Sequence, residues 1–226
     1  WLYEVKLGAT TVWERWNSML ADGSVSSTGM NSFNHYSYGS IVEWMYAYVA
    51  GIRQAEDGVG FRHVCICPVV DSRLGHAEAA YQSGMGLWKS SWRAPDDYHL
   101  EVRVTVPFGC QADVVLPYAP ESVYGDKANP MFADVADGVC HLTAGQYSVS
   151  YATTAPLRKI YSTATPLKEL LEVPAIRDFL TEKIPRIGQV PEHMRSGSIR
   201  DLAAQFEEHL EDGTLEALDE ALAKLA

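Results

Sequence analysis

The feature that most constrains the fold of this chain is a strict alternation of polar and apolar residues near its middle. The polar set Glu101, Arg103 and Thr105 alternates with the apolar set Val102, Val104 and Val106. A period of two is typical of a β-strand with one face in a core and the other in solvent. The chain is therefore expected to contain a sheet that buries one face against a second layer.

Further strand candidates surround this run and are separated by turn residues. They lie at residues 61–67, 77–82, 86–92, 98–106, 111–116, 139–142 and 147–151. Many short strands at regular spacing favour an antiparallel β-sandwich, which we expect at residues 56–155. We expect Trp88 and Trp92 to pack in the core or against another domain rather than to serve as sugar platforms.

The last part of the chain changes to helix-forming residues with recognisable start signals. These signals are Thr165 followed by Pro166, then Pro174, Ser198 and Thr214. Apolar residues recur at helical spacing after each signal, including Phe206 and Leu210 in the third segment. The pattern predicts a small helical bundle at residues 156–226, and it contains no catalytic constellation.

Most candidate site residues lie in the first part of the chain. Thr11 and Glu14 fit the T-x-x-E pattern of a capping box, which predicts a helix at residues 11–20. Trp13 and Trp16 would share one face of that helix. Sugar-cleaving sites combine a carboxylate with indole rings that hold apolar sugar faces, so both tryptophans are candidate substrate-binding residues. Both interpretations of Glu14, cap and catalytic group, stay open.

A second helix is expected at residues 35–52, since apolar residues there follow helical spacing and Gly51 is a plausible stop signal. His35 lies where this helix would begin. A lone histidine at such a position is more often structural than part of a site. Residues 20–32 are rich in Gly, Ser and Asp, which predicts a loop between the two helices.

Two segments in this region resemble a known enzyme family. The sequences GATTVWERW at residues 8–16 and GMNSFNHYSYGSI at residues 29–41 resemble the late part of the catalytic barrel of bacterial inverting α-L-rhamnosidases. Segments between residues 66 and 117 resemble the β-sandwich that follows that barrel. The resemblance implies an α+β multidomain fold class, in which residues 1–55 are the last helices of an (α/α)6 barrel.

The resemblance also implies roles for single residues. In that family the glutamate of the W-E-x-W element is the general base that activates the attacking water, which here is Glu14. The histidine of the N-H-Y-S-Y-G element contacts rhamnose, which here is His35. The family's general acid lies upstream of the sequence present here, so the resemblance implies the C-terminal piece of a larger enzyme that needs its missing N-terminal part.

Charge, hydropathy and cysteine content bear on the partners, metal sites and location of the protein. The net charge of −11 argues against a nucleic-acid partner, and the apolar runs are too interrupted to span a membrane. The four cysteines lack paired C-x-x-C elements, which argues against structural zinc, so we expect free thiols and neither metal nor cofactor. A cross-strand disulfide stays open if the protein is secreted. No leader is visible, which favours the cytoplasm, although a longer chain would make that absence uninformative.

The expected function is hydrolysis of terminal α-L-rhamnosyl residues from rhamnosylated glycosides or oligosaccharides with inversion, as part of a longer chain. The piece alone would lack the general acid, so we expect it to be inactive. It would also expose an aromatic surface at residues 1–52, which predicts self-association or mobile helices. Two rivals stay open: a carbohydrate-binding module on the sandwich, and a structural C-terminal assembly without a ligand.

Overall fold

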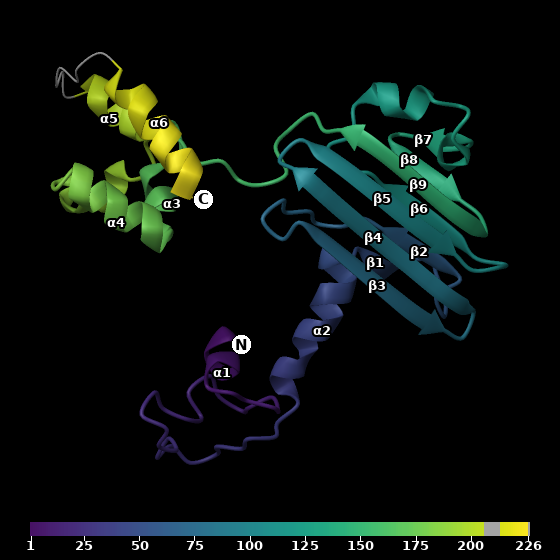
Figure 1. Ribbon diagram of the computed structural model, residues 1–226, viewed down its shortest axis with the longest axis horizontal. Helices are drawn as coiled ribbons and strands as arrows, with labels where there is room; N and C mark the ends of the chain where they lie inside the picture. Colours follow the sequence, from purple (N-terminus) through teal and green to yellow (C-terminus); the bar gives the residue numbers. More distant parts are fainter. Residues whose placement is uncertain (206–212, 226) are drawn as a thin grey trace. The chain divides into compact units, whose positions relative to one another are not determined.

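A computed structural model describes residues 1–205 and 213–225 of this protein. The fold is mixed α+β with two sheets, and the chain divides into two compact units at residues 1–157 and 158–226 (Figure 1). The boundary expected between residues 155 and 156 lies next to this division.

Two sheets form most of the first unit (Figure 1). One sheet has the strand order β3-β4-β5-β9 and the other has the order β1-β2-β6-β8-β7. The strands are β1 Ile52–Gln54, β2 His63–Ile66, β3 His76–Ser83, β4 Gly86–Asp96, β5 His99–Val106, β6 Gln111–Val115, β7 Val135–Ala136, β8 Val139–Leu142 and β9 Gly145–Ala152.

The two sheets share one apolar core. In β5 the alternation seen in the sequence places Val102 and Val104 in this core, as expected, while Arg103 is exposed. Trp88 and Trp92 are 0% and 2% exposed, which confirms that they pack in the core. Burying a large apolar side chain stabilises a fold by about 1.5–3 kcal/mol, so these two indoles contribute strongly to the stability of the core.

Two features of the sheets differ from the prediction. β2 and β6 are parallel, so the five-stranded sheet is mixed rather than antiparallel. The sequence does not predict β1 or β7, and β1 begins at residue 52, where the helix expected at residues 35–52 would end. β7 has two residues and β1 has three, and strands this short carry too few side chains to show a period of two.

The helix predicted at residues 11–20 is wrong. The chain begins with a short helix, α1 (Leu2–Lys6), and then forms turns and irregular loop over residues 9–36. Within this loop, residues 11–14 and 32–35 lie side by side and are called here the paired segments. The Glu14 N–H donates to the Ser32 carbonyl at 2.9 Å, and the His35 N–H donates to the Val12 carbonyl at 2.8 Å.

The second predicted helix exists but is shorter than expected. Residues 37–49 form one helical stretch of three kinds, a 3₁₀ turn (Ser37–Ser40), α2 (Ile41–Trp44) and a π-helical turn (Met45–Val49). Gly51 has a φ of +81° and ends it, which confirms the predicted stop.

The end of this helical stretch is bonded to β4. The Trp92 indole donates to the Val49 carbonyl at 2.7 Å, and the Ser90 hydroxyl donates to the Ala50 carbonyl at 2.6 Å. Both donors come from buried side chains of β4, so the helix end is fixed against the four-stranded sheet.

The second unit contains four α-helices in its described part, α3 (Leu167–Glu172), α4 (Pro174–Lys183), α5 (Ile199–Gln205) and α6 (Thr214–Leu225). They share a small core of buried leucine and isoleucine side chains.

Pro174 is the first residue of α4, as predicted. Pro166, rather than Thr165, is the N-cap of α3, and it forms no side-chain cap, so that prediction is wrong. The predicted inward residues Phe206 and Leu210 lie outside the described residues. No helix in the described ranges is long and apolar enough to cross a membrane.

Candidate active site

Each of the paired segments carries one of the two residues expected to perform the chemistry. Glu14 lies on one segment and His35 on the other, and both side chains are half-buried. The backbone bonds hold the two segments side by side although they are far apart in sequence. The site therefore rests on two hydrogen-bonded loop segments and not on two helix ends.

The carboxylate of Glu14 is held by the opposite segment. Its Oε2 accepts a hydrogen bond from the Ser32 N–H at 2.8 Å. Within residues 1–205 and 213–225, no group donates a hydrogen bond to Oε1. The carboxylate thus has a fixed orientation and one oxygen that can accept a proton from water.

The capping-box prediction for Glu14 is wrong. Thr11 donates its hydroxyl proton to the Phe33 carbonyl and caps no helix. The pattern T-x-x-E does not distinguish a helix start from a loop, because polar side chains such as those of Thr11 and Glu14 also form hydrogen bonds within loops.

His35 lies just before the helical stretch and contacts its first turn. Its Nδ1 accepts a hydrogen bond from the Ser37 N–H at 3.3 Å, which agrees with the structural role weighed from the sequence. An accepting Nδ1 assigns the ring proton to Nε2. Nε2 is then a donor suited to a sugar hydroxyl, so the structural and functional roles use different nitrogens.

Trp13 and Trp16 do not share a helix face. Trp13 is 3% exposed and packs edge-on against Phe33 with ring centroids 5.4 Å apart. Trp16 is 41% exposed and stacks on Tyr38 at 4.1 Å, while Trp1 approaches it edge-on at 4.6 Å. Trp13 therefore supports the paired segments from inside, whereas Trp16 belongs to a surface aromatic cluster.

The sequence did not predict a polar cluster on the outer face of the five-stranded sheet. Both oxygens of Asp113 in β6 contact histidines, His63 Nε2 at 3.0 Å and His141 Nδ1 at 2.7 Å, and His63 Nδ1 lies 2.8 Å from Asp57. Strand register brings His63, Asp113 and His141 together, so only sheet pairing could have revealed their contacts. Among the described residues, no group of three or more His, Cys, Asp or Glu side chains is placed to hold a metal ion.

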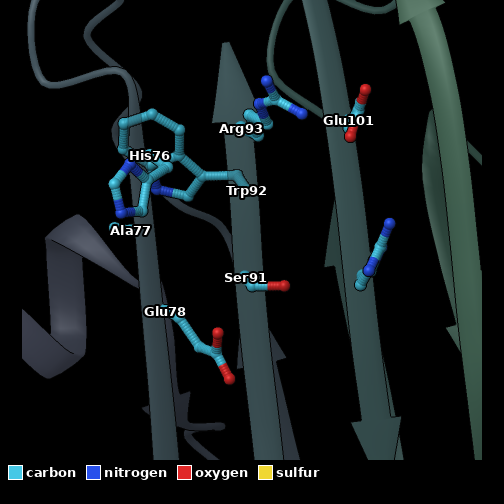
Figure 2. A pocket seen from close by; sticks show the side chains of 8 residues that line it. His76, Ala77, Glu78, Ser91, Trp92, Arg93 and Glu101 are labelled. Atoms are coloured by element: carbon cyan, nitrogen blue, oxygen red, sulfur yellow. The ribbon is translucent and has the colours of Figure 1, made fainter.

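A hollow of about 380 Å³ lies on the outer face of the four-stranded sheet (Figure 2). Its side chains come from β3, β4 and β5, which are neighbours in the sheet. The lining is His76, Ala77, Glu78, Ser91, Trp92, Arg93, Glu101 and Arg103. Side chains of both charges lie in this hollow, with Arg93 in register between His76 and Glu101. Mixed charges of this kind are typical of a solvated sheet face, and none of the expected site residues lies there.

Comparison with known proteins places these features in a family. Residues 1–49 match the family model described as the bacterial alpha-L-rhamnosidase 6 hairpin glycosidase domain. Residues 51–129 match the model described as the bacterial alpha-L-rhamnosidase C-terminal domain. Over its first 129 residues, the chain belongs to the bacterial alpha-L-rhamnosidase family.

Curated rhamnosidases agree with this assignment over about half of the chain. An alpha-L-rhamnosidase from an Alteromonas species is 40% identical over 117 residues, which is 52% of this chain and 12% of that protein. One from Streptomyces avermitilis is 39% identical over 117 residues, 52% of this chain and 11% of that protein. The match thus spans only about a tenth of the length of either rhamnosidase.

A solved rhamnosidase structure shows the same likeness in three dimensions. The crystal structure of Streptomyces avermitilis alpha-L-rhamnosidase complexed with L-rhamnose matches with a TM-score of 0.56 and 32% identity. The match covers 66% of this chain and 14% of that chain. In the rhamnosidase family match, Glu14 and His35 fall within the glycosidase-domain part, and residues 130–226 lie beyond both matched ranges.

Proposed function

We propose that this chain carries the C-terminal region of an enzyme that hydrolyses terminal α-L-rhamnosyl residues from glycosides with inversion. The observation that carries the proposal is the match of residues 1–49 to a glycosidase domain, together with the held carboxylate of Glu14 within that match. The crystal structure named above, an alpha-L-rhamnosidase complexed with L-rhamnose, supports rhamnose as the sugar.

In the proposed reaction Glu14 is the general base. Its ionised carboxylate takes a proton from a water molecule as the water oxygen bonds to the anomeric carbon. The bond from that carbon to the glycosidic oxygen breaks, and a carboxylic acid on the opposite side protonates the leaving oxygen. Attack from the opposite face inverts the configuration and requires the two carboxyl groups to be about 6.5–9.5 Å apart, which leaves room for the water.

His35 and the tryptophans would bind the sugar. The Nε2–H of His35 would donate to a rhamnose hydroxyl, while its Nδ1 stays bound to the Ser37 N–H. Trp16 has exposed ring surface that can contact an apolar sugar face. The burial of Trp13 supports a packing role, and its contact with sugar stays a prediction.

The proposal assigns the general acid and most of the sugar pocket to further helical hairpins of the same polypeptide. The matched glycosidase domain is described by six hairpins, whereas the residues of this chain that match it form the short helix α1, a loop region and one helical stretch. We therefore expect the 226-residue chain alone to lack rhamnosidase turnover.

The test uses the complete polypeptide encoded by its gene. Glu14→Gln should lower kcat on an aryl α-L-rhamnoside by about 10² to 10⁴. The Gln side chain keeps an oxygen that can accept the Ser32 N–H, so unfolding free energy should change by less than about 1 kcal/mol. The first product formed should be the β-anomer, as followed by proton NMR.

Two further variants complete this test. His35→Ala should raise KM and lower kcat, because a sugar hydroxyl loses its donor. Glu56→Gln is the control, since Glu56 is an exposed carboxylate outside the glycosidase-domain match. Wild-type kinetics for both Glu14→Gln and His35→Ala would exclude the assigned site.

A further inference from the structure

We propose that Arg15 is a positioning residue for Glu14, an inference that rests on the proposed function. Arg15 follows Glu14 directly, and its guanidinium reaches back to the other side of the loop. Its Nε donates to the Met30 carbonyl at 3.0 Å and its Nη2 donates to the Gly29 carbonyl at 3.4 Å. Arg15 thus holds the backbone that leads into the Ser32 N–H, the donor bound to the Glu14 carboxylate.

The backbone at Met30 needs such support. Met30 has a φ of +57°, a left-handed conformation that is unfavourable for a residue with a Cβ. Its side chain is 79% exposed, so packing does not hold this conformation. The hydrogen bond from Arg15 to the Met30 carbonyl is therefore a direct means of holding the strained turn.

The turn at Met30 decides where the next residues lie. Asn31 donates its amide to the carbonyls of Ser18 at 3.1 Å and Ser26 at 3.3 Å, which fixes the chain immediately after the turn. Ser32 follows, with its N–H on the carboxylate and its carbonyl on the Glu14 N–H. A change in the φ of Met30 would rotate this peptide and move the carboxylate with it.

The backbone of Arg15 itself is fixed from the inside. Its N–H donates to the hydroxyl of Ser18 at 3.3 Å, and Ser18 is fully buried. An arginine suits this position because its planar fork presents several donors in fixed directions, whereas a lysine offers one compact ammonium group. Arg15 therefore joins two carbonyls of one turn from a rigid starting point.

The first experiment uses the chain itself and needs no enzyme activity. Arg15→Ala should speed amide exchange at Ser32 by about 10-fold, the effect of losing about one net hydrogen bond. Adding Met30→Gly should restore slow exchange, because glycine adopts the left-handed conformation without cost. Arg93→Ala, on the outer face of the four-stranded sheet, is the matched control and should leave Ser32 unchanged.

The second experiment measures kinetics in the complete polypeptide. Arg15→Ala should lower kcat by about 10-fold and leave KM within about 2-fold, because a misplaced base slows the chemical step more than binding. Arg15→Ala/Met30→Gly should recover most of kcat. Arg15→Lys should be intermediate, and it provides a folded comparison if the alanine variant fails to fold.

The outcomes separate this inference from the proposed function. Unchanged Ser32 exchange in Arg15→Ala overturns the positioning role, whatever the kinetics. A large rise in KM that Met30→Gly does not rescue also overturns it, because Arg15 would then contact substrate. If Glu14→Gln retains full kcat while Ser32 exchange still depends on Arg15, the proposed function fails and the structural role of Arg15 stands.

Discussion

At the scale of single residues, two glycines with positive φ differ in the space around them. Gly51 connects the helical stretch to β1, and its φ is +81°. A Cβ built there would lie 2.4 Å from the Pro68 nitrogen, so both conformation and space require glycine. Gly60 also has a positive φ, +63°, but has open space around its missing Cβ. The pair separates the cost of conformation from the cost of a backbone clash.

Gly51→Ala should lower the unfolding free energy of the first unit by about 3 kcal/mol or more, because the adjacent backbone cannot yield as a flexible side chain would. Gly60→Ala should cost only about 1 kcal/mol, the conformational part. Urea unfolding followed by the fluorescence of the buried tryptophans measures both values. Equal losses for the two variants would show that the contact with Pro68 relaxes freely.

At the scale of elements, the helical stretch at residues 37–49 ends in a π-helical turn, and the residues at this end are bonded to β4. In its last turn the Ala50 N–H donates to the Met45 carbonyl at 2.9 Å, the wider bond of a π-helix. The next two carbonyls accept hydrogen bonds from side chains of β4. The Val49 carbonyl accepts from Trp92, and the Ala50 carbonyl accepts from Ser90. The π turn thus helps to dock the helix onto the sheet.

The start of α5 shows a true capping box, in contrast to the one expected at Thr11. Asp201 accepts hydrogen bonds from the N–H of Ser198 at 2.9 Å and from its hydroxyl at 2.7 Å, and the Asp201 N–H donates to the Ser198 hydroxyl at 3.1 Å. The backbone bond from Ser198, followed by the hydroxyl bond, lowers the pKa of Asp201. The predicted helix start at Ser198 is therefore confirmed.

This capping box predicts a pH dependence for the second unit. Because the pKa of Asp201 is lowered on folding, its stabilisation is present above the ordinary aspartate pKa and is lost as the pH falls through the lowered value. We expect amides at the start of α5 to exchange faster, relative to the rest of the unit, as the pH falls below about 4. NMR exchange rates corrected for intrinsic pH effects measure this change.

The control is Asp201→Asn, which keeps an oxygen acceptor and cannot ionise. Its amides at the start of α5 should show no such acid step. A step of equal size in the variant would assign the pH effect to other carboxylates, such as Asp219, which contacts the Thr163 N–H and Arg200.

At the scale of the whole molecule, the first unit exposes a large apolar surface around its helical stretch. Val42, Trp44 and Met45 are each about half exposed. They line a groove of about 1220 Å³ that extends along β3. Apolar patches larger than a few hundred Å² are rare on monomers and usually mark contact surfaces. In the proposed enzyme, further helical hairpins would cover this groove.

The isolated 226-residue chain should therefore self-associate through residues 1–52, or its helical stretch should become mobile. Burial at about 25 cal/mol per Å² can contribute several kcal/mol, enough for weak association. Trp44→Glu should reduce the apparent mass in light scattering at high concentration. Phe108→Ser, which removes a 91% exposed ring from a sheet turn, is the control and should have no effect. A strict monomer with slow amide exchange across residues 35–52 would contradict both expectations.

The sequence by itself predicted the parts of this protein whose signals are local. The alternation in β5 indicated which side chains enter the core, Gly51 indicated the helix end, and Ser198 indicated the start of α5. Each signal works because it lies within a few residues and depends on the backbone conformation at that point. The resemblance carried by W-E-R-W and N-H-Y-S-Y-G also selected Glu14 and His35 as candidate site residues.

Tertiary structure alone decided the features that depend on partners distant in sequence. The parallel pairing of β2 with β6 and the cluster at Asp113 follow from strand register. Glu14 shows the physical reason most clearly. Its local pattern was compatible with a helix start, but the peptide groups of Ser32 supplied its hydrogen bonds and made a loop the more stable arrangement. A local pattern does not say which distant backbone will satisfy a polar group, and that partner decides the conformation.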